Sequence, residues 1–106
     1  MSNPSKRKGS GFELEVVHIL QELGLAAEKV PLSGMLGGNY SHDVKVSVPV
    51  LNCDKSLECK RRARAFQTLY TMMGGAYALV VRDDHCKPLV VMPLDRWAAL
   101  ARGAVP

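Results

Sequence analysis

The sequence predicts an α/β domain with a central mixed β-sheet flanked by helices. Residues 12–23 carry apolar side chains at the spacing of an amphipathic helix, and residues 42–48 alternate between apolar and polar side chains like a half-buried strand. Two apolar runs, residues 77–81 and 89–92, are joined by a polar turn and predict a hairpin. Helical and strand periods that succeed one another along one chain are typical of the α/β class.

The size and composition of the chain predict one domain over residues 1–106. A chain of 106 residues can bury a single core but has little room for a second. The hydrophobic fraction is 47%, yet no apolar run approaches the roughly 20 residues of a membrane span, so no membrane partner is expected. The three cysteines form no CxxC pair, which argues against a disulfide framework and a structural zinc site. We therefore expect a reducing cytoplasm.

The formal net charge of +4 favours a polyanionic partner, although solubility alone would also explain it. Part of this charge lies in residues 1–9, which are expected to form a flexible basic arm that contacts either phosphates or nothing. Ser10 is placed to cap the following helix, with Glu13 completing a capping box, and Gly24 is placed to end that helix. The basic residues of this arm are Lys6, Arg7 and Lys8.

Two acids in the first turn of this helix, Glu13 and Glu15, are candidates for a functional carboxylate. At about 100° per residue both flank the apolar stripe, so periodicity does not choose between them. Glu15 lies on the side of polar neighbours, whereas Glu13 lies on the side of Leu20, which should face the sheet. This slightly favours Glu13 as the inward acid. The helix dipole favours both acids for purely structural reasons as well.

A glycine-rich loop, residues 33–41, follows a predicted strand over residues 26–32. The loop serves either the close approach of backbone to a ligand or a simple turn. Asp43 opens the alternating strand directly after this loop, and a further strand is expected over residues 56–60. If those two strands pair, Asp43 and Glu58 lie side by side.

The predicted chemistry is organised around Glu58, Cys59 and Lys60. On an extended strand Glu58 and Lys60 share one face, and with Asp43 they present two carboxylates and an amine together. Carboxylate oxygens suit Mg2+, and a neighbouring lysine can steady developing charge or help activate a metal-bound water. This combination indicates phosphodiester hydrolysis. The alternative is a solvated strand face, where Glu and Lys two residues apart occur by chance.

Three arginines follow this triplet at the mouth of a second predicted helix, which runs to about Met73. They suit substrate phosphates, to which each guanidinium can donate two hydrogen bonds, or they are simply the solvated start of a helix. Gln67 follows one turn later and either binds substrate or lies on the surface. A closing helix over residues 94–102 is expected to be a structural cover. The three arginines are Arg61, Arg62 and Arg64.

The order of these motifs resembles the PD-(D/E)XK nuclease superfamily, and within it the archaeal-type Holliday-junction resolvases and their small phage relatives. The resemblance covers the chain from about Gly9 to Met92. Residues 9–15, Gly-Ser-Gly-Phe-Glu-Leu-Glu, are similar to the family's first helix and place its glutamate at Glu13. Asp43 with the Glu58-Cys59-Lys60 triplet matches the core motif, and Ser33 resembles the serine of the loop near the scissile phosphate.

This resemblance implies a restriction-endonuclease-like core and a homodimer that cuts branched DNA in recombination and repair. It implies Mg2+, for which Mn2+ can substitute, held by Asp43, Glu58 and Glu13, with Lys60 as the fourth catalytic residue. DNA would be bound by the basic arm, Ser33, the three arginines and Gln67. For a phage relative, the place of action would be the host cytoplasm.

The chain also departs from the family pattern. His42 stands in place of the proline before Asp43, and Leu14 occupies a position where resolvases tend to carry an arginine. Gln67 and Tyr70 resemble the Gln-Tyr helix motif of related nucleases only loosely in spacing. Two alternatives therefore stay open: a restriction- or repair-type nuclease of the same fold on duplex or single-stranded DNA, and a non-catalytic basic DNA-binding module.

Overall fold

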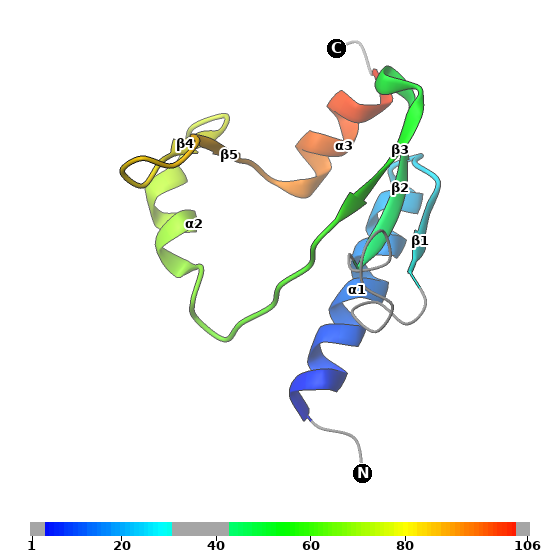
Figure 1. Ribbon diagram of the computed structural model, residues 1–106, viewed down its shortest axis with the longest axis horizontal. Coiled ribbons are helices and arrows are strands. Elements are labelled where there is room, and N and C mark those ends of the chain that lie inside the picture. Colours follow the sequence, from blue (N-terminus) through cyan, green and yellow to red (C-terminus); the bar gives the residue numbers. More distant parts are fainter. Residues whose placement is uncertain (1–3, 31–42, 104–106) are drawn as a thin grey trace.

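The computed structural model describes residues 4–30 and 43–103 and confirms the α/β class (Figure 1). Its helices are α1 (Pro4–Glu22), α2 (Gln67–Met73) and α3 (Leu94–Arg102), with a short 3-10 helix, η2 (Pro49–Leu51). Its strands are β1 (Ala27–Lys29), β2 (Val44–Val48), β3 (Cys53–Leu57), β4 (Leu79–Val81) and β5 (Leu89–Val91). No helix within the described ranges is long and apolar enough to cross a membrane.

The strands β1, β2 and β3 form an antiparallel sheet with β2 in the middle. The alternation predicted for β2 is confirmed, because Val44, Val46 and Val48 are buried while Lys45 is exposed. These valines pack against α1 and α3, and each fully buried Val or Leu side chain contributes about 1.5–3 kcal/mol. The buried residues from the two helices are Val16, Val17, Leu20, Ala98 and Ala101. We call α1, β1–β3, η2 and α3 together the body.

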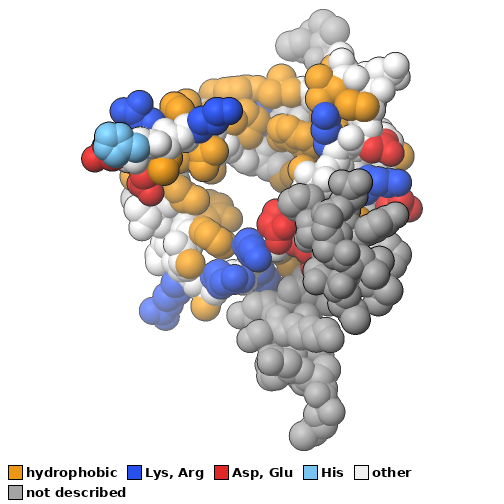
Figure 2. All heavy atoms as spheres, viewed as in Figure 1, with side chains coloured by type: hydrophobic (Ala, Val, Ile, Leu, Met, Phe, Trp, Pro, Cys, Tyr) orange, Lys and Arg blue, Asp and Glu red, His pale blue; other side chains and the backbone are white. Residues whose placement is uncertain are grey.

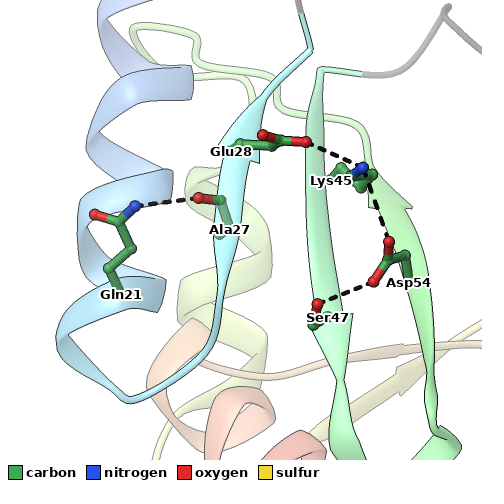
Figure 3. A network of polar contacts seen from close by, with 6 residues as sticks. All are labelled: Gln21, Ala27, Glu28, Lys45, Ser47 and Asp54. Atoms are coloured by element: carbon green, nitrogen blue, oxygen red, sulfur yellow. Dashed lines mark hydrogen bonds and ion pairs between the residues drawn. The ribbon is translucent and has the colours of Figure 1, made fainter.

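The opposite face of the sheet is polar (Figure 3). Lys45 Nζ lies 3.0 Å from Glu28 Oε1 and 3.8 Å from Asp54 Oδ2, which links all three strands. Asp54 Oδ1 also accepts a hydrogen bond of 2.9 Å from Ser47 Oγ. The sheet therefore buries one face only, as expected for an antiparallel sheet with one solvated side.

The turn between β2 and β3 is tighter than the sequence predicted. A strand was expected over residues 56–60, but β3 begins at Cys53 and ends at Leu57. The reversal is made by η2, which has a proline in its first turn, and by Asn52, whose φ of 54° is tolerated by asparagine better than by most residues. The expected strand over residues 56–60 therefore ends three residues early.

Helix α1 begins earlier than predicted and ends where predicted. The expected N-cap at Ser10 is wrong, because the helix starts at Pro4 and Ser10 lies inside it; most of the predicted flexible arm is therefore helical. Proline suits a first helical turn because it has no N–H that would be left without a partner there. Gly24, with a φ of +90°, ends the helix, and Leu25 N donates to Leu20 O at 2.9 Å across the end.

The elements α2, β4 and β5, residues 67–91, form a lobe that stands apart from the body (Figure 1). The hairpin predicted in this region is confirmed, with β4 and β5 antiparallel. The expectation of one central mixed sheet is not met by the described strands, which form two separate antiparallel sheets. The lobe is joined to the body by residues 58–66, which follow β3, and by residues 92–93, which precede α3. The bounds predicted for α3 are confirmed.

Candidate active site

Asp43 is the one buried acid among the described residues, with an exposed fraction of 9%. Its backbone N–H donates to Leu57 O at 3.1 Å, although Leu57 already faces Val44 in the strand register. Asp43 and Val44 on one side of the ladder thus both face Leu57 on the other. This is the arrangement of a β-bulge, which turns a side chain in a new direction. The Asp43 carboxylate accepts a 2.7 Å hydrogen bond from the backbone N–H of Cys59. Asp43 is thereby fixed at the end of the β2–β3 pair.

Glu13 on α1 meets Asp43, as the weak preference from helix geometry suggested. Burial raises the pKa of Glu13, and the negative charge of Asp43 together with a hydrogen bond between the two carboxyl groups raises it further. Lys29 on β1 opposes this shift, with Nζ 3.6 Å from Glu13 Oε2. The Glu13 side chain is only 15% exposed. Two carboxyl groups in hydrogen-bond contact hold a proton between them more readily than two negative charges.

Glu58 and Lys60 follow β3 as an extended segment and lie on its exposed side. The predicted alternation is confirmed, because Leu57 and Cys59 pack against the core while Glu58 and Lys60 are exposed. Lys60 Nζ lies 3.4 Å from Glu58 Oε1. All four residues also line an open cleft of about 600 Å3, whose apolar wall includes Phe12.

The Cys59 side chain lies among the predicted acids. Burial raises the pKa of the Cys59 thiol to about 11, and the negative charges of Asp43, Glu13 and Glu58 add to the shift in that order. The thiol therefore stays protonated at neutral pH and is a poor nucleophile. Asp43, Glu13 and Glu58 are thus all near enough to Cys59 to influence its charge.

The described residues do not by themselves complete a metal centre. No group of three or more His, Cys, Asp or Glu side chains within residues 4–30 and 43–103 is arranged to hold an ion. Glu13 and Asp43 form one pair, whereas Glu58 is paired with Lys60. Both pairs contain hard oxygen donors, which is the donor chemistry that Mg2+ prefers.

The three arginines predicted to bind phosphates lie on an exposed connection and not on a helix. Helix α2 begins at Gln67, so Arg61, Arg62 and Arg64 precede it, and all four side chains are exposed. Arg62 Nη1 donates to Arg61 O at 2.9 Å. The arginines follow Lys60 in the chain, so a cationic segment adjoins the Glu58-Cys59-Lys60 triplet.

Two groups of predicted residues fall outside what the structure describes. Ser33 and the rest of the glycine-rich loop lie between the described ranges. Lys6, Arg7 and Lys8 belong to α1, but the structure does not describe their side chains. Their proposed contacts with DNA stay predictions.

Sequence reasoning missed two groups at this site, Lys29 and the backbone N–H of Cys59. Lys29 alternates with Glu28, so it shares the face of Ala27, which packs against the core. A lysine on the inward side of a predicted strand was the available indication, because such a cation usually has an acidic partner. The sequence did not indicate that the Cys59 N–H donates to Asp43. This hydrogen bond depends on where the pairing of β2 with β3 stops.

Comparisons with models of protein families, with curated proteins and with solved structures found no match.

Proposed function

We propose that this protein is a Mg2+-dependent endodeoxyribonuclease that hydrolyses phosphodiester bonds, with branched DNA as its substrate and a homodimer as its working form. One observation supports this most strongly: the carboxyl groups of Glu13, on α1, and of Asp43, directly before β2, meet where the Glu58-Cys59-Lys60 stretch passes. These residues are distant in sequence, so their meeting does not follow from local structure.

The pair of Glu13 and Asp43 fits a hard divalent cation. Two carboxyl groups held in contact repel one another when both are ionised, and the pKa of Glu13 is raised first by burial and then by the negative charge of Asp43. A cation can take the place of the shared proton, so its binding would release that proton. Mg2+ bound by Asp43, Glu13 and Glu58 would polarise the scissile phosphate and lower the pKa of a water molecule.

The other groups at the site have positioning and electrostatic roles. The Cys59 N–H holds the Asp43 carboxylate in place through its 2.7 Å hydrogen bond. Lys60 lines the cleft and pairs with Glu58. When the substrate phosphate takes the place of Glu58, the Lys60 ammonium group would stabilise the negative charge that develops on that phosphate. Arg61, Arg62 and Arg64 would hold the DNA backbone and give an affinity that falls with salt.

Cleavage assays with matched variants test the proposal. The purified chain with Mg2+ is expected to cut DNA, four-way junctions faster than linear duplex or single strands, and to stop in EDTA. Asp43→Asn and Lys60→Ala should each reduce the rate by at least about a hundredfold. The exposed residues Asp84 and Lys55 offer controls, because Asp84→Asn and Lys55→Ala should leave the rate unchanged. Undiminished cutting by Asp43→Asn and Lys60→Ala together would remove the basis of the proposal.

A second test measures cation binding without DNA. Mg2+ should stabilise the folded protein against urea in proportion to the logarithm of its concentration above the dissociation constant. Glu13→Gln should weaken this stabilisation, and the wild-type effect should grow as the pH rises, because ionised Glu13 binds the cation and protonated Glu13 does not. A Mg2+ effect of equal size in wild type and Glu13→Gln would exclude Glu13 as a ligand.

A second candidate function is a non-catalytic nucleic-acid-binding module. It is favoured by the ion pair that engages Lys60 with Glu58 and by the lack of a ready group of metal ligands among the described residues. Salt-dependent DNA binding that persists in wild type without any Mg2+-dependent cutting would establish this function in place of hydrolysis.

A further inference from the structure

The lobe formed by α2, β4 and β5 has no core of its own. None of its residues, 67–91, is buried, and the connections on either side of it bury none either. Most of the largest exposed apolar side chains of the described chain belong to it. They are Tyr70, Met72, Tyr77, Val80, Leu89 and Val90. Exposed apolar area of this extent marks a surface that another protein surface covers.

The β4–β5 hairpin has the character of an interior strand pair. Val91 lies in a cavity with Leu69 and Met73 of α2, so α2 lines one face of the hairpin. Val80 and Val90 face one another across the two strands. Side chains alternate along a strand, so these two lie on the face opposite Val91, and they are 70% and 60% exposed. A hairpin of two short strands is marginal by itself, and apolar residues on both faces are typical of strands covered on both sides.

The body presents the complementary surface. β3 is an edge strand, and its outer edge has no hydrogen-bonded strand among the described elements. Beside it opens the cleft of about 600 Å3 (Figure 2). One wall of the cleft is made by Phe12, Val16, Leu57 and Trp97 of the body, and the other by Val90, Val91 and Met92 of the same chain. The cleft stays open between them, so the edge of β3 and the outer edges of the hairpin both lack a neighbouring strand among the described elements.

The lobe is held away from the β3 of its own chain. Arg96 of α3 stacks over the Tyr77 ring, 4.4 Å from its centroid, and donates a hydrogen bond to Tyr77 O. At the other end, Pro93 restricts the two-residue connection between β5 and α3. Residues 58–66 lead from the end of β3 away to α2 (Figure 1), so within one copy the hairpin is not paired with the β3 edge.

We infer that two copies of this chain exchange lobes, each laying its β4–β5 hairpin along the β3 edge of the other. The same two complementary surfaces occur on every copy, so a two-fold axis satisfies both at once. Glu58 and Lys60 follow directly after β3 and share the cleft with Val90 and Val91 of their own chain, so a hairpin of the partner along β3 would lie beside the candidate site. The inference does not depend on nuclease chemistry.

The mass of the full-length chain in solution tests the exchange. Light scattering after size-exclusion chromatography should give twice the 11.6 kDa of one chain. Val90→Lys and Val80→Lys should reduce the mass to that of one chain, with an unchanged circular dichroism spectrum, because both side chains are already exposed within one copy. Val50→Lys is the matched control, since Val50 is 55% exposed on the body, and it should stay dimeric.

Hydrogen exchange of the wild-type protein gives a second measurement that needs no variant. Amide protection over residues 53–57 and 79–81 should fall by at least about tenfold on dilution below the dissociation constant. Protection that does not depend on concentration, in a protein with the mass of one chain, would show closure within the chain and overturn the exchange. A dimer that survives both lysine variants would also overturn it.

Discussion

The body and the lobe contain similar apolar residue types but differ in what these residues do. In the body, Leu20, Val44 and Val46 are fully buried between α1 and the sheet. In the lobe, Leu89, Val90 and Val80 are 60–70% exposed. The hydrophobic contribution to stability is proportional to the apolar area removed from water, so these similar residues have very different energetic weight.

The candidate site shows the same division. Glu13 and Asp43 belong to the body and are largely enclosed, so their positions are set by the packing of α1 on β2. Arg61, Arg62 and Arg64 belong to the connection that leads to the lobe and are exposed. Under the proposed function, the acids would thus lie on the packed part of the molecule and the cations that contact DNA on the exposed connection.

The largest expected effect separates body from lobe by truncating one leucine in each. Leu20→Ala should lower the free energy of unfolding by about 2–5 kcal/mol, because Leu20 is fully buried and its removal leaves a cavity. Leu89→Ala, at a 63% exposed position, should change it by less than about 0.5 kcal/mol in the isolated chain. Urea unfolding at low protein concentration measures both. Equal losses in the two variants would contradict the division into body and lobe.

The next effect concerns the hydrogen bond that fixes the site. Asp43→Ala should lower the free energy of unfolding by about 1–3 kcal/mol, because it leaves the Cys59 N–H without the carboxylate that accepts it at 2.7 Å. Asp43→Asn keeps an acceptor oxygen and should cost less than Asp43→Ala. If the two variants unfold at the same urea concentration, the contact with Cys59 contributes nothing to stability.

Glu13 is expected to be a residue whose charge destabilises the fold. Its pKa in the folded protein is raised above the ordinary value of 4.5, so stability present below that value is lost as the pH rises through the raised pKa. Glu13→Gln should therefore be more stable than wild type at pH 7 without Mg2+. The difference should vanish in acid. Thermal unfolding across pH measures it, and a variant less stable than wild type at pH 7 would contradict the pairing of Glu13 with Asp43.

The sequence predicted the parts of this protein that depend on local periodicity. The valine alternation of β2, the glycine that ends α1 and the bounds of α3 all follow from side-chain spacing and capping chemistry. The meeting of Glu13 with Asp43 was favoured only weakly, because spacing around a helix places a residue on a face without naming its neighbour across the sheet.

The features that the sequence did not predict are set by tertiary contacts. The early end of β3 at Leu57 depends on Asp43 N–H donating to Leu57 O, and this shift of the ladder has no mark in the residue pattern. Whether β4 and β5 join the main sheet depends on which strand edges pair in the folded protein. The apolar content of the two strands does not determine this. The start of α1 at Pro4 was missed because two favourable signs of a helix start, a capping box and a first-turn proline, compete within the same segment.

The smallest expected effect lies on the solvated face of the sheet. Lys45 joins Glu28 and Asp54 in Figure 3, yet all three side chains are about half exposed or more, so water can replace each contact. Lys45→Met should leave the midpoint of urea unfolding unchanged within error, and any residual shift should disappear at about 1 M salt, where such pairs are screened. Lys29→Met is the informative comparison, because Lys29 opposes the raised pKa of the largely enclosed Glu13. If Lys45→Met proved the more damaging of the two, ion pairs on the open face, and not burial against α1, would hold the body together.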